Sequence, residues 1–323
     1  MLMQHLRVIN PVLTNMSIAM RQAKTGFVAD LLAPDVPVNG DTGTIPIWEA
    51  NQHTRIKSSY WAKGAVAPMI GLRASSTTFS VKKYGLSTPI DDDDRQNYLM
   101  PGSLDEEATS TLTDLLMLDR EKRVYDKVVA IAHDLDLVSG SGTQWNEAQC
   151  VPKVDIQGGI QKIMKATMKI PNVLVLGAPV WDSIMTATTT GHAGQQFAAA
   201  FINVMAATGK TLTTERFAEY VGVDRVVVAN AIYEAADETT TVVTAGNTTG
   251  TYIWGDWGIL CYTEPTPQIG SVSFMKSFTS FPMSMLPTYR KDDVEADIYR
   301  IKAKWDEKVV AEECVYVIED MLA

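Results

Sequence analysis

Long apolar runs are missing from this 323-residue sequence, and so are paired cysteines and an excess of positive charge. No stretch approaches the roughly 20 apolar residues that cross a bilayer, and the first residues lack the sustained apolar core of a signal peptide. We therefore expect a soluble chain that is made in the cytosol. Cys150, Cys261 and Cys314 lie far apart, without the close spacing that binds zinc or the even number that suggests a disulfide framework, so they are interpreted as isolated thiols.

The negative charge of the chain argues against tight binding to nucleic acid. The formal net charge is −10, and such a field repels polyphosphate unless basic side chains are strongly segregated. A DNA-binding regulator is therefore disfavoured, whereas a container wall that encloses nucleic acid without gripping it is compatible with this charge. The apolar share of 46% and the charged share of 20% indicate a folded globular chain and exclude intrinsic disorder.

The first part of the chain has the pattern of an extended arm followed by a long hairpin. Residues 1–40 show little periodicity and are interrupted by prolines, which favours an arm over a long helix. Alternating polar and apolar residues at 44–48 and 77–81 predict two strands with a polar stretch between them. An isolated hairpin is marginally stable in water, so this one folds onto its own domain or contacts another subunit, and both alternatives are open. Tyr60 and Trp61 at its tip would be costly to expose and are candidate contact anchors.

The clearest element is a long helix from about Ser103 to His133. Ser103 and Glu106 have the spacing of a capping box, and leucine and alanine recur after them at helical intervals. Acidic residues fill the first turn and basic residues the second half, which matches the helix dipole. Some thirty residues with a rise of about 1.5 Å each form a rod of about 45 Å, far longer than the usual globular helix. This length suggests a structural spine.

From Val154 to about Pro265 the pattern changes to alternating helices and strands. This region of about 110 residues has the normal size of a compact α/β domain. The tail from Ser271 returns to strand-like alternation. The expected elements of the α/β region are helices at 155–169 and 211–220 and strands at 173–176, 225–228, 239–243, 251–254 and 258–263.

Two motifs could bind ligands, but each has a simpler explanation. The segment Thr208–Thr211 imitates the end of a phosphate-binding loop, yet Val204 stands where the first glycine of such a loop is needed. A run of four carboxylates lacks the alternating spacing and the interior glycine of a calcium loop. We expect a solvated acidic turn there, after a strand that ends at Ile90, with a charge contact to a neighbouring subunit's lysines or arginines as the functional alternative. The four carboxylates are Asp91, Asp92, Asp93 and Asp94.

The remaining polar residues form no catalytic constellation. Lys162, Lys165 and Lys169 share one helical face, which is interpreted as the solvated side of an amphipathic helix, with binding to phosphates or acidic partners as the alternative. None of the histidines has a carboxylate or cysteine at ligand spacing, and no nucleophile elbow accompanies them. The sequence therefore predicts neither an enzyme nor a bound cofactor or metal. The histidines are His5, His53, His133 and His192.

Several short segments occur in an order and at spacings that are specific together, although each one alone is weak. They are 10–15, 27–34, 36–38, 43–47, 84–92, Asp119-Arg120-Glu121, 142–145, 171–177, Val180-Trp181 and 253–255. With these segments the chain resembles, over nearly its whole length, the major capsid proteins of tailed bacteriophages that have the Hong Kong 97-type fold. The resemblance is closest to members that are made without a fused scaffolding segment.

The resemblance implies an α+β subunit of the Hong Kong 97 type. Its parts would be an N-terminal arm (1–39), an extended hairpin loop laid over a neighbour (40–82), a peripheral domain with the spine helix 103–133 (83–153), an axial domain (154–265) and C-terminal strands of the peripheral domain (266–323). Copies would form the pentamers and hexamers of an icosahedral virion shell around double-stranded DNA, assembled in the host cytoplasm. Scaffolding and portal proteins, and in some members decoration proteins, are the further partners that the resemblance implies, and no membrane is involved.

Some members of this family cross-link a hairpin lysine to an asparagine of a neighbour. Lys57 and Lys63 are available, but no matching acceptor motif is present, so this chemistry is not carried over. Both lysines join Tyr60, Trp61 and the four carboxylates as candidate intersubunit contacts. Because Met1 begins within the arm, we expect any scaffold or maturation protease to be a separate protein.

Two other functions are compatible with the sequence. An encapsulin, the shell protein of a bacterial nanocompartment, has the same fold and encloses protein cargo instead of DNA. A nucleotide-dependent enzyme that uses Thr208–Thr211 is the alternative from a different class. The contents of purified particles distinguish the first from a phage capsid, and calorimetry with ATP tests the second.

Overall fold

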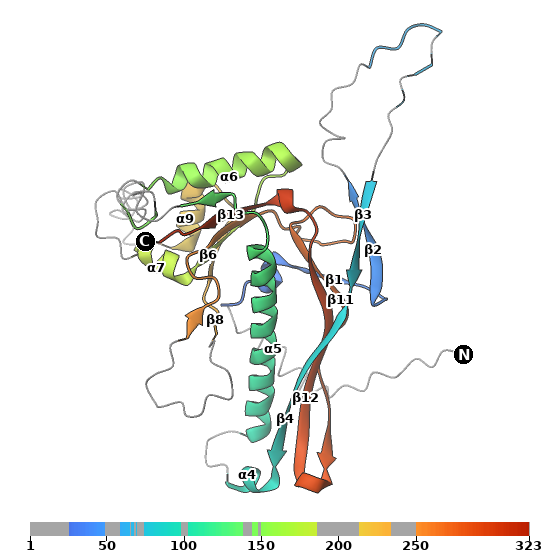
Figure 1. Cartoon of the computed structure of the whole chain (residues 1–323), viewed down its shortest axis with the longest axis vertical. Coiled ribbons are helices and arrows are strands. Elements are labelled where there is room, and N and C mark those ends of the chain that lie inside the picture. Colours follow the sequence, from blue (N-terminus) through green and yellow to red (C-terminus); the bar gives the residue numbers. More distant parts are fainter. Residues whose placement is uncertain are drawn as a thin grey trace.

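The computed structural model describes residues 26–48, 59–64, 66–67, 69, 74–97, 103–137, 144–147, 150–185, 213–233 and 250–322. Together they form an elongated mixture of helices and sheets, with a long helix beside long strands at one end and a compact α/β part at the other (Figure 1). None of the described helices is long and apolar enough to cross a membrane. The segment 1–25, Lys57, Thr208–Thr211 and the strand expected at 239–243 lie outside the described residues, as do His5, His53 and His192.

The expected spine is helix α5, which runs from Leu104 to Val129. Ser103 caps it as predicted, because its Oγ accepts a hydrogen bond from the Glu106 N–H at 3.2 Å. The helix ends four residues earlier than the expected His133. The chain is diverted there because Asp134 pairs with a distant strand, its N–H donating to the Val317 carbonyl at 3.1 Å.

A four-stranded sheet packs one face against α5. Alternate residues of its central strand β12 (Ala296–Val309) are buried against the helix. Among them, Ile301 and Trp305 pack in one apolar cluster with Leu112 and Leu116. The other residues of that strand face away from α5, and most of them are charged. In spatial order the strands are β1 (Asp35–Pro37), β11 (Met275–Lys291), β12 (Ala296–Val309) and β4 (Lys82–Asp91), with η1 (Asp292–Val294) between β11 and β12.

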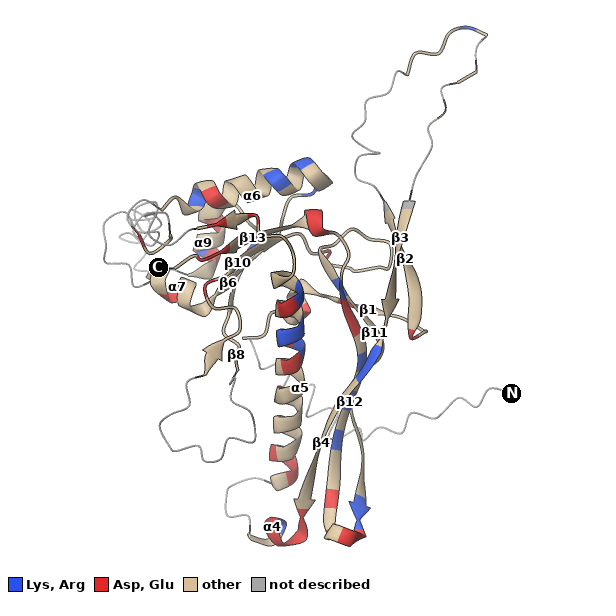
Figure 2. Cartoon of the chain, in the orientation of Figure 1, with Lys and Arg blue, Asp and Glu red and all other residues tan. Residues whose placement is uncertain are grey.

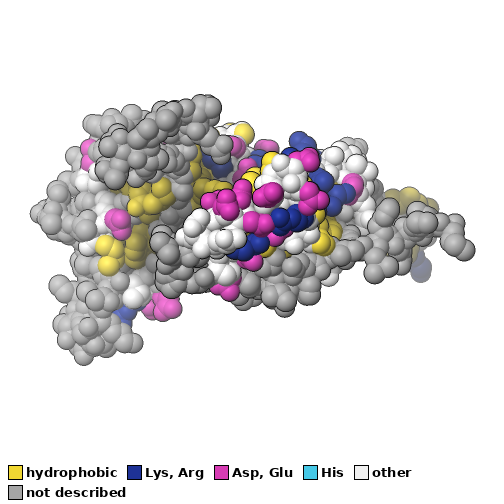
Figure 3. All heavy atoms as spheres, turned by 90° about the horizontal axis from the view of Figure 1, so that it is seen from below, with side chains coloured by type: hydrophobic (Ala, Val, Ile, Leu, Met, Phe, Trp, Pro, Cys, Tyr) yellow, Lys and Arg dark blue, Asp and Glu magenta, His cyan; other side chains and the backbone are white. Residues whose placement is uncertain are grey.

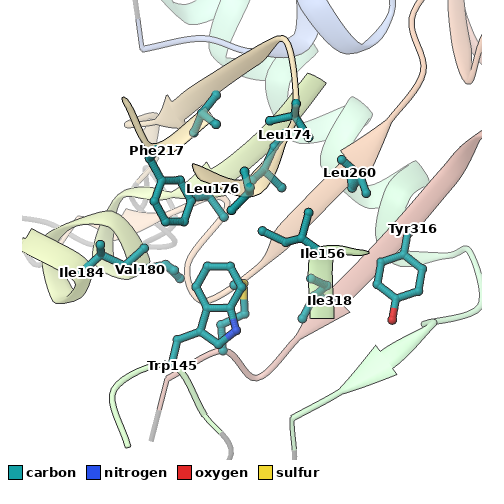
Figure 4. Close-up of a cluster of buried hydrophobic side chains, with 14 of the residues drawn as sticks. Trp145, Ile156, Leu174, Leu176, Val180, Ile184, Phe217, Leu260, Tyr316 and Ile318 are labelled. Carbon is teal, nitrogen blue, oxygen red and sulfur yellow. The ribbon is translucent and has the colours of Figure 1, made fainter. Parts of the chain in front are cut away.

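A five-stranded sheet forms the compact α/β part. Apolar side chains of its strands and of the covering helices, among them Leu174 and Phe217, point toward one another in one core, which Trp145 joins from a turn (Figure 4). The strands in spatial order are β5 (Leu135–Asp136), β13 (Val315–Glu319), β10 (Gly258–Cys261), β6 (Val173–Gly177) and β7 (Arg225–Ala229), and the helices are α6 (Pro152–Thr167), α7 (Ala178–Met185) and α9 (Thr214–Val221).

These elements confirm the helices and strands expected near 155–169, 211–220, 173–176, 225–228 and 258–263, with shifted ends. The strand expected at 251–254 is limited to β9 (Thr251–Tyr252), which pairs with β8 (Ile232–Tyr233). The last strand was expected with the other C-terminal strands in 266–323, but β13 lies in the five-stranded sheet beside β10. The reason is its apolar run Val315–Ile318, which is buried on both faces and fits an inner strand.

The expected hairpin is a two-stranded ribbon formed by β2 (Thr42–Trp48) and β3 (Ala74–Ser80). Its base packs on the body, because the Phe79 ring stacks on Phe278 of β11 with centroids 4.6 Å apart. Gly43 is required opposite this ring, since a Cβ there would lie 2.6 Å from Phe79 atoms. The base of the ribbon is thus supported by its own chain, as the first alternative predicted.

Two segments connect the sheets and run side by side. The first is 262–274, before β11, and the second is 310–314, after β12. The second includes η2 (Glu312–Cys314). Backbone hydrogen bonds join them, from Tyr262 N to Cys314 O at 2.9 Å and from Val310 N to Phe274 O at 2.9 Å. The buried Lys276 ammonium holds the first connection by donating to the carbonyls of Gln268 (2.6 Å) and Ser271 (2.5 Å). Burial lowers the pKa of Lys276 to about 8.

Candidate assembly surfaces

The segment beyond the open end of the β2–β3 ribbon carries exposed aromatic side chains. Residues 59–64 lie away from the body (Figure 1). Tyr60 is 81% exposed and Trp61 is 62% exposed, and Lys63 beside them is exposed as well. Such rings are the usual anchors of protein contacts because they bury a large apolar area at low conformational cost. The assignment of Tyr60, Trp61 and Lys63 to an intersubunit contact stays a prediction.

A buried carboxylate of the spine helix α5 holds the short helix α2 (Ala29–Leu32), which lies within the expected N-terminal arm. Glu121 of α5 accepts hydrogen bonds from the backbone N–H of Val28 (3.1 Å) and Ala29 (2.8 Å) and from the indole N–H of Trp254 (2.5 Å). Burial raises the pKa of Glu121, and the three donors partly offset this rise. One side chain thus joins three segments that are far apart in the sequence.

The neighbouring Arg120 completes this junction. Its guanidinium is buried and pairs with Asp30 at 2.5 Å and with Asp35 at 2.8 Å, and it lies 4.6 Å from the centre of the Trp305 ring. Burial lowers the pKa of Arg120, but Asp35, Asp30 and Glu307 raise it more, so the group stays charged. Sequence analysis identified Asp119-Arg120-Glu121 only as a family motif and missed its role in holding residues 28–35.

The basic second half of α5 serves the same purpose on the sheet side. Glu307 of β12 is 1% exposed, and Arg123 reaches its Oε1 at 3.1 Å. Lys127 donates to the Glu307 backbone carbonyl, and burial lowers the pKa of Lys127. Figure 2 shows the positions of charged residues gathered along this half of the helix. They fix the spine to β12 in addition to matching the dipole that the sequence suggested.

The expected acidic turn is different in the structure. Asp91 ends β4, while Asp92, Asp93 and Asp94 form the first turn of the short helix α4 (Asp92–Asn97). The carboxylates occupy this position because negative charge is favourable at a helix N-terminus. Asp92 binds Arg290 of its own chain at 2.6 Å, and this hydrogen bond lowers the pKa of Asp92. A charge contact of the four carboxylates with a neighbouring subunit stays a prediction.

The lysine face of α6 is partly engaged with its own chain. Lys162 forms an ion pair with Asp134, and Lys169 lies 5.3 Å from the centre of the Tyr262 ring. Lys165 is exposed, as expected for the solvated side of a helix.

The three cysteines are buried free thiols, and burial raises the pKa of Cys314 to about 12. Among the described residues no group of acidic, histidine and cysteine side chains could hold a metal ion.

A histidine closes the end of the spine against the C-terminal strand. His133 Nδ1 lies 2.5 Å from Glu319 Oε2, and its ring packs edge-on against Trp257. The hydrogen bond to Glu319 raises the pKa of His133 above its ordinary value of 6.5. Since the folded state binds this proton more tightly than the unfolded chain, the stabilisation is complete below about pH 6.5 and is lost as the pH rises through the raised pKa.

We therefore expect His133→Gln to lower the melting temperature at pH 5.5 by roughly 1–2 °C, because such a partly exposed pair contributes about 1 kcal/mol or less. Above the raised pKa the difference from the wild type should shrink. Thermal unfolding measured from pH 5.5 to 8.5 tests this, with Lys165→Gln as the control for an exposed site. An equal loss at every pH would show that packing against Trp257 alone matters.

No protein-family model matches the chain. A 186-residue stretch is 27% identical to the "Major capsid protein" of Burkholderia phage BcepMu, covering 55% of this chain and 58% of that protein. The chain thus aligns with little more than half the length of this curated relative.

Solved structures match over much more of the chain. A phage-related protein from Bordetella bronchiseptica has a TM-score of 0.68 at 17% identity, covering 98% of both chains. The virus-like particle from Pyrococcus furiosus has a TM-score of 0.54 at 10% identity, covering 95% of this chain and 98% of that one. The bacteriophage PhiM1 mature capsid has a TM-score of 0.51 at 10% identity, covering 89% and 85%. The chain has the α+β capsid fold of the Hong Kong 97 type, as the resemblance predicted.

Proposed function

We propose that this chain, which belongs by sequence and fold with the major capsid proteins of tailed bacteriophages, is the subunit of an icosahedral head shell and encloses double-stranded DNA. In this proposal it is a structural protein of the virion and catalyses no reaction. The observation that carries it is the sequence match to a phage major capsid protein within a chain that matches a phage capsid structure over 89% of its length. Pentamers and hexamers are the assemblies that we infer, and scaffolding and portal proteins are the inferred further partners.

The exposed segment beyond the ribbon supplies the physical reason for self-association. Burying Tyr60 and Trp61 against a neighbour would contribute about 2 kcal/mol for each ring. A single contact of this size is weak, but in a closed shell each subunit makes and receives the same contact. Because all contacts of one subunit form together, their combined strength far exceeds that of any one of them. In this proposal the part of the hairpin loop 40–82 beyond the ribbon base lies on an adjacent subunit, and 154–265 surround the capsomer axis.

The direct test is electron microscopy of the purified full-length chain. We expect closed icosahedral particles, either from the chain alone or after co-expression with a scaffolding protein. A compact monomer under both conditions would overturn the proposal. Calorimetry with ATP is expected to give no binding heat, and binding at Thr208–Thr211 would instead support the nucleotide-dependent enzyme.

An encapsulin-type shell is the second candidate, since such shells have the same fold according to the resemblance, and a virus-like particle from Pyrococcus furiosus shares it too. A likeness of fold at 10% identity is compatible with both functions. Particles recovered from the native source distinguish them by their contents. Double-stranded DNA inside the particles supports the phage capsid, whereas enclosed protein cargo supports the encapsulin.

A further inference from the structure

A basic groove crosses the face of the four-stranded sheet that points away from α5. Its volume is about 290 Å³, and β4, β11 and β12 line it. Three of its lining residues are basic and none is acidic, although the whole chain carries a net charge of −10. The basic groove comprises Lys83, Gly85, Ser87, Leu286, Arg300 and Lys302.

The strand pattern places these cations on one face. Along β12, Ile301 and Ala303 are buried against the helix side, so Arg300 and Lys302 face the opposite side. Next to them, Lys304 is directly opposite Lys83 of β4. Like charges in this position repel each other unless an anion is near. Asp41 supplies one for Lys304 at 2.7 Å and also interacts electrostatically with Lys302, but it is not among the residues that line the groove.

The floor and walls of the groove suit a carboxylate. At Gly85 a Cβ would lie 2.7 Å from the Ile301 carbonyl oxygen, so only glycine fits, and the floor carries no side chain there. The Arg300 guanidinium lies 4.4 Å from the centre of the Tyr289 ring. Its Nε is buried and has no hydrogen-bond partner among the described residues. Through Nη2 the same guanidinium donates to the Pro287 carbonyl at 3.3 Å. Arg300 also lines the groove, and a carboxylate is the strongest acceptor for a guanidinium.

The far end of the same strands carries the opposite charge, on an acidic tip made of five carboxylates. Figure 3 shows acidic side chains gathered at this end of the molecule, with basic ones beside them. All five are exposed, and the Asp292 side chain reaches 91%. The two turns that carry them are joined by a hydrogen bond from Asp92 N to Glu295 O at 3.3 Å. The acidic tip comprises Asp93, Asp94, Asp292, Asp293 and Glu295.

The acidic tip cannot enter the groove of its own chain. Glu295 and Lys302 are seven positions apart along one strand, which corresponds to roughly 23 Å of extended backbone. The acidic tip of a second copy is not kept away from the groove by this distance. It is present at the same concentration as the groove, because every copy carries both.

We propose that the basic groove binds the acidic tip of a second copy of this chain, with the Arg300 guanidinium and the ammonium groups of Lys83 and Lys302 contacting its carboxylates. The contact rests on the proposed function, because it needs many copies held close together. Its strength comes from charge-assisted hydrogen bonds, which also select the orientation of the two copies.

Charge reversal tests this contact. We expect Lys83→Glu with Lys302→Glu to lower the particle yield by about tenfold or more, while the melting temperature of the subunit stays near that of the wild type. Asp93→Lys with Asp293→Lys should have the same effect, and the two pairs combined should restore particles. Lys153→Glu with Lys165→Glu, on the exposed face of α6, makes the same change in net charge and should leave the yield unchanged. Sedimentation and electron microscopy measure the yield.

Each alternative outcome has a defined meaning. Normal yield from the groove variant, or no restoration in the combined variant, would overturn the groove contact and leave the shell function intact. Normal shells that take up less DNA would overturn it too, since the groove would then bind phosphate. Failure of the wild type itself to form particles would count against the proposed function instead.

Discussion

Shortening the segment beyond the β2–β3 ribbon is expected to abolish closed shells while leaving the subunit folded. Replacing residues 50–73 by a short Gly-Ser turn keeps all ribbon pairs from Thr42 with Ser80 to Trp48 with Ala74. It also keeps the stacking of Phe79 on Phe278 that holds the ribbon base. The exposed aromatic pair is lost, and with it the proposed contact that every subunit of the shell would repeat. A modest loss in each contact would then become a total loss of assembly.

The measurement is particle formation by electron microscopy, together with circular dichroism and thermal unfolding of the isolated subunit. Tyr60→Ala with Trp61→Ala should reproduce most of the effect, whereas Lys63→Ala should have little effect because it removes no aromatic anchor. Normal particles from the shortened chain would refute the role given to this segment. Normal particles from the double alanine variant alone would refute only the choice of anchors.

Glu121→Ala is expected to destabilise the folded subunit more than a typical single substitution does. The change leaves the N–H groups of Val28, Ala29 and Trp254 buried without an acceptor. Each buried donor without a partner costs about 1–3 kcal/mol, so the total loss should be roughly 3–5 kcal/mol. For a chain of this size the melting temperature should fall by about 6–10 °C.

Asp119→Ala is the matched control, since it removes a carboxylate two residues earlier on the same helix. Asp119 is 53% exposed and pairs with Arg123, so its loss should cost about 1 kcal/mol or less. Thermal unfolding of both variants provides the comparison. Equal small effects would mean that α2 is held mainly by the apolar contacts of Val28 and Leu32, and the role of Glu121 as the fastening group would be wrong.

Local signals predicted much of the fold. Ser103 and Glu106 correctly identified the start of α5, because capping depends on a few adjacent residues. The helix end and the position of β13 could not be predicted in the same way. The helix end depends on pairing between Asp134 and Val317, which are 183 residues apart. The apolar run Val315–Ile318 indicates an inner strand but does not identify β10 as its neighbour. Pairing partners at such a distance leave no periodic signal near either residue.

The junction at Arg120 and Glu121 left a signal that sequence analysis overlooked. Leu116, Arg120 and Val124 follow one another at intervals of four, so the arginine stands within the apolar stripe of the helix. A charged residue in such a stripe is buried with a partner far more often than it is exposed. This reasoning predicts buried ion pairs for Arg120, but it cannot name Asp30 and Asp35, which come from the arm side.

The paired connections between the two sheets restrict how the subunit can change shape. Because Tyr262 and Phe274 of the first connection are hydrogen-bonded to Cys314 and Val310 of the second, both connections must bend together. Bending across both connections keeps these hydrogen bonds, whereas twisting the compact part around the long strands would strain them. An expanding or contracting shell built from such subunits would therefore change its curvature at the two connections, while the inner packing of each sheet stays the same.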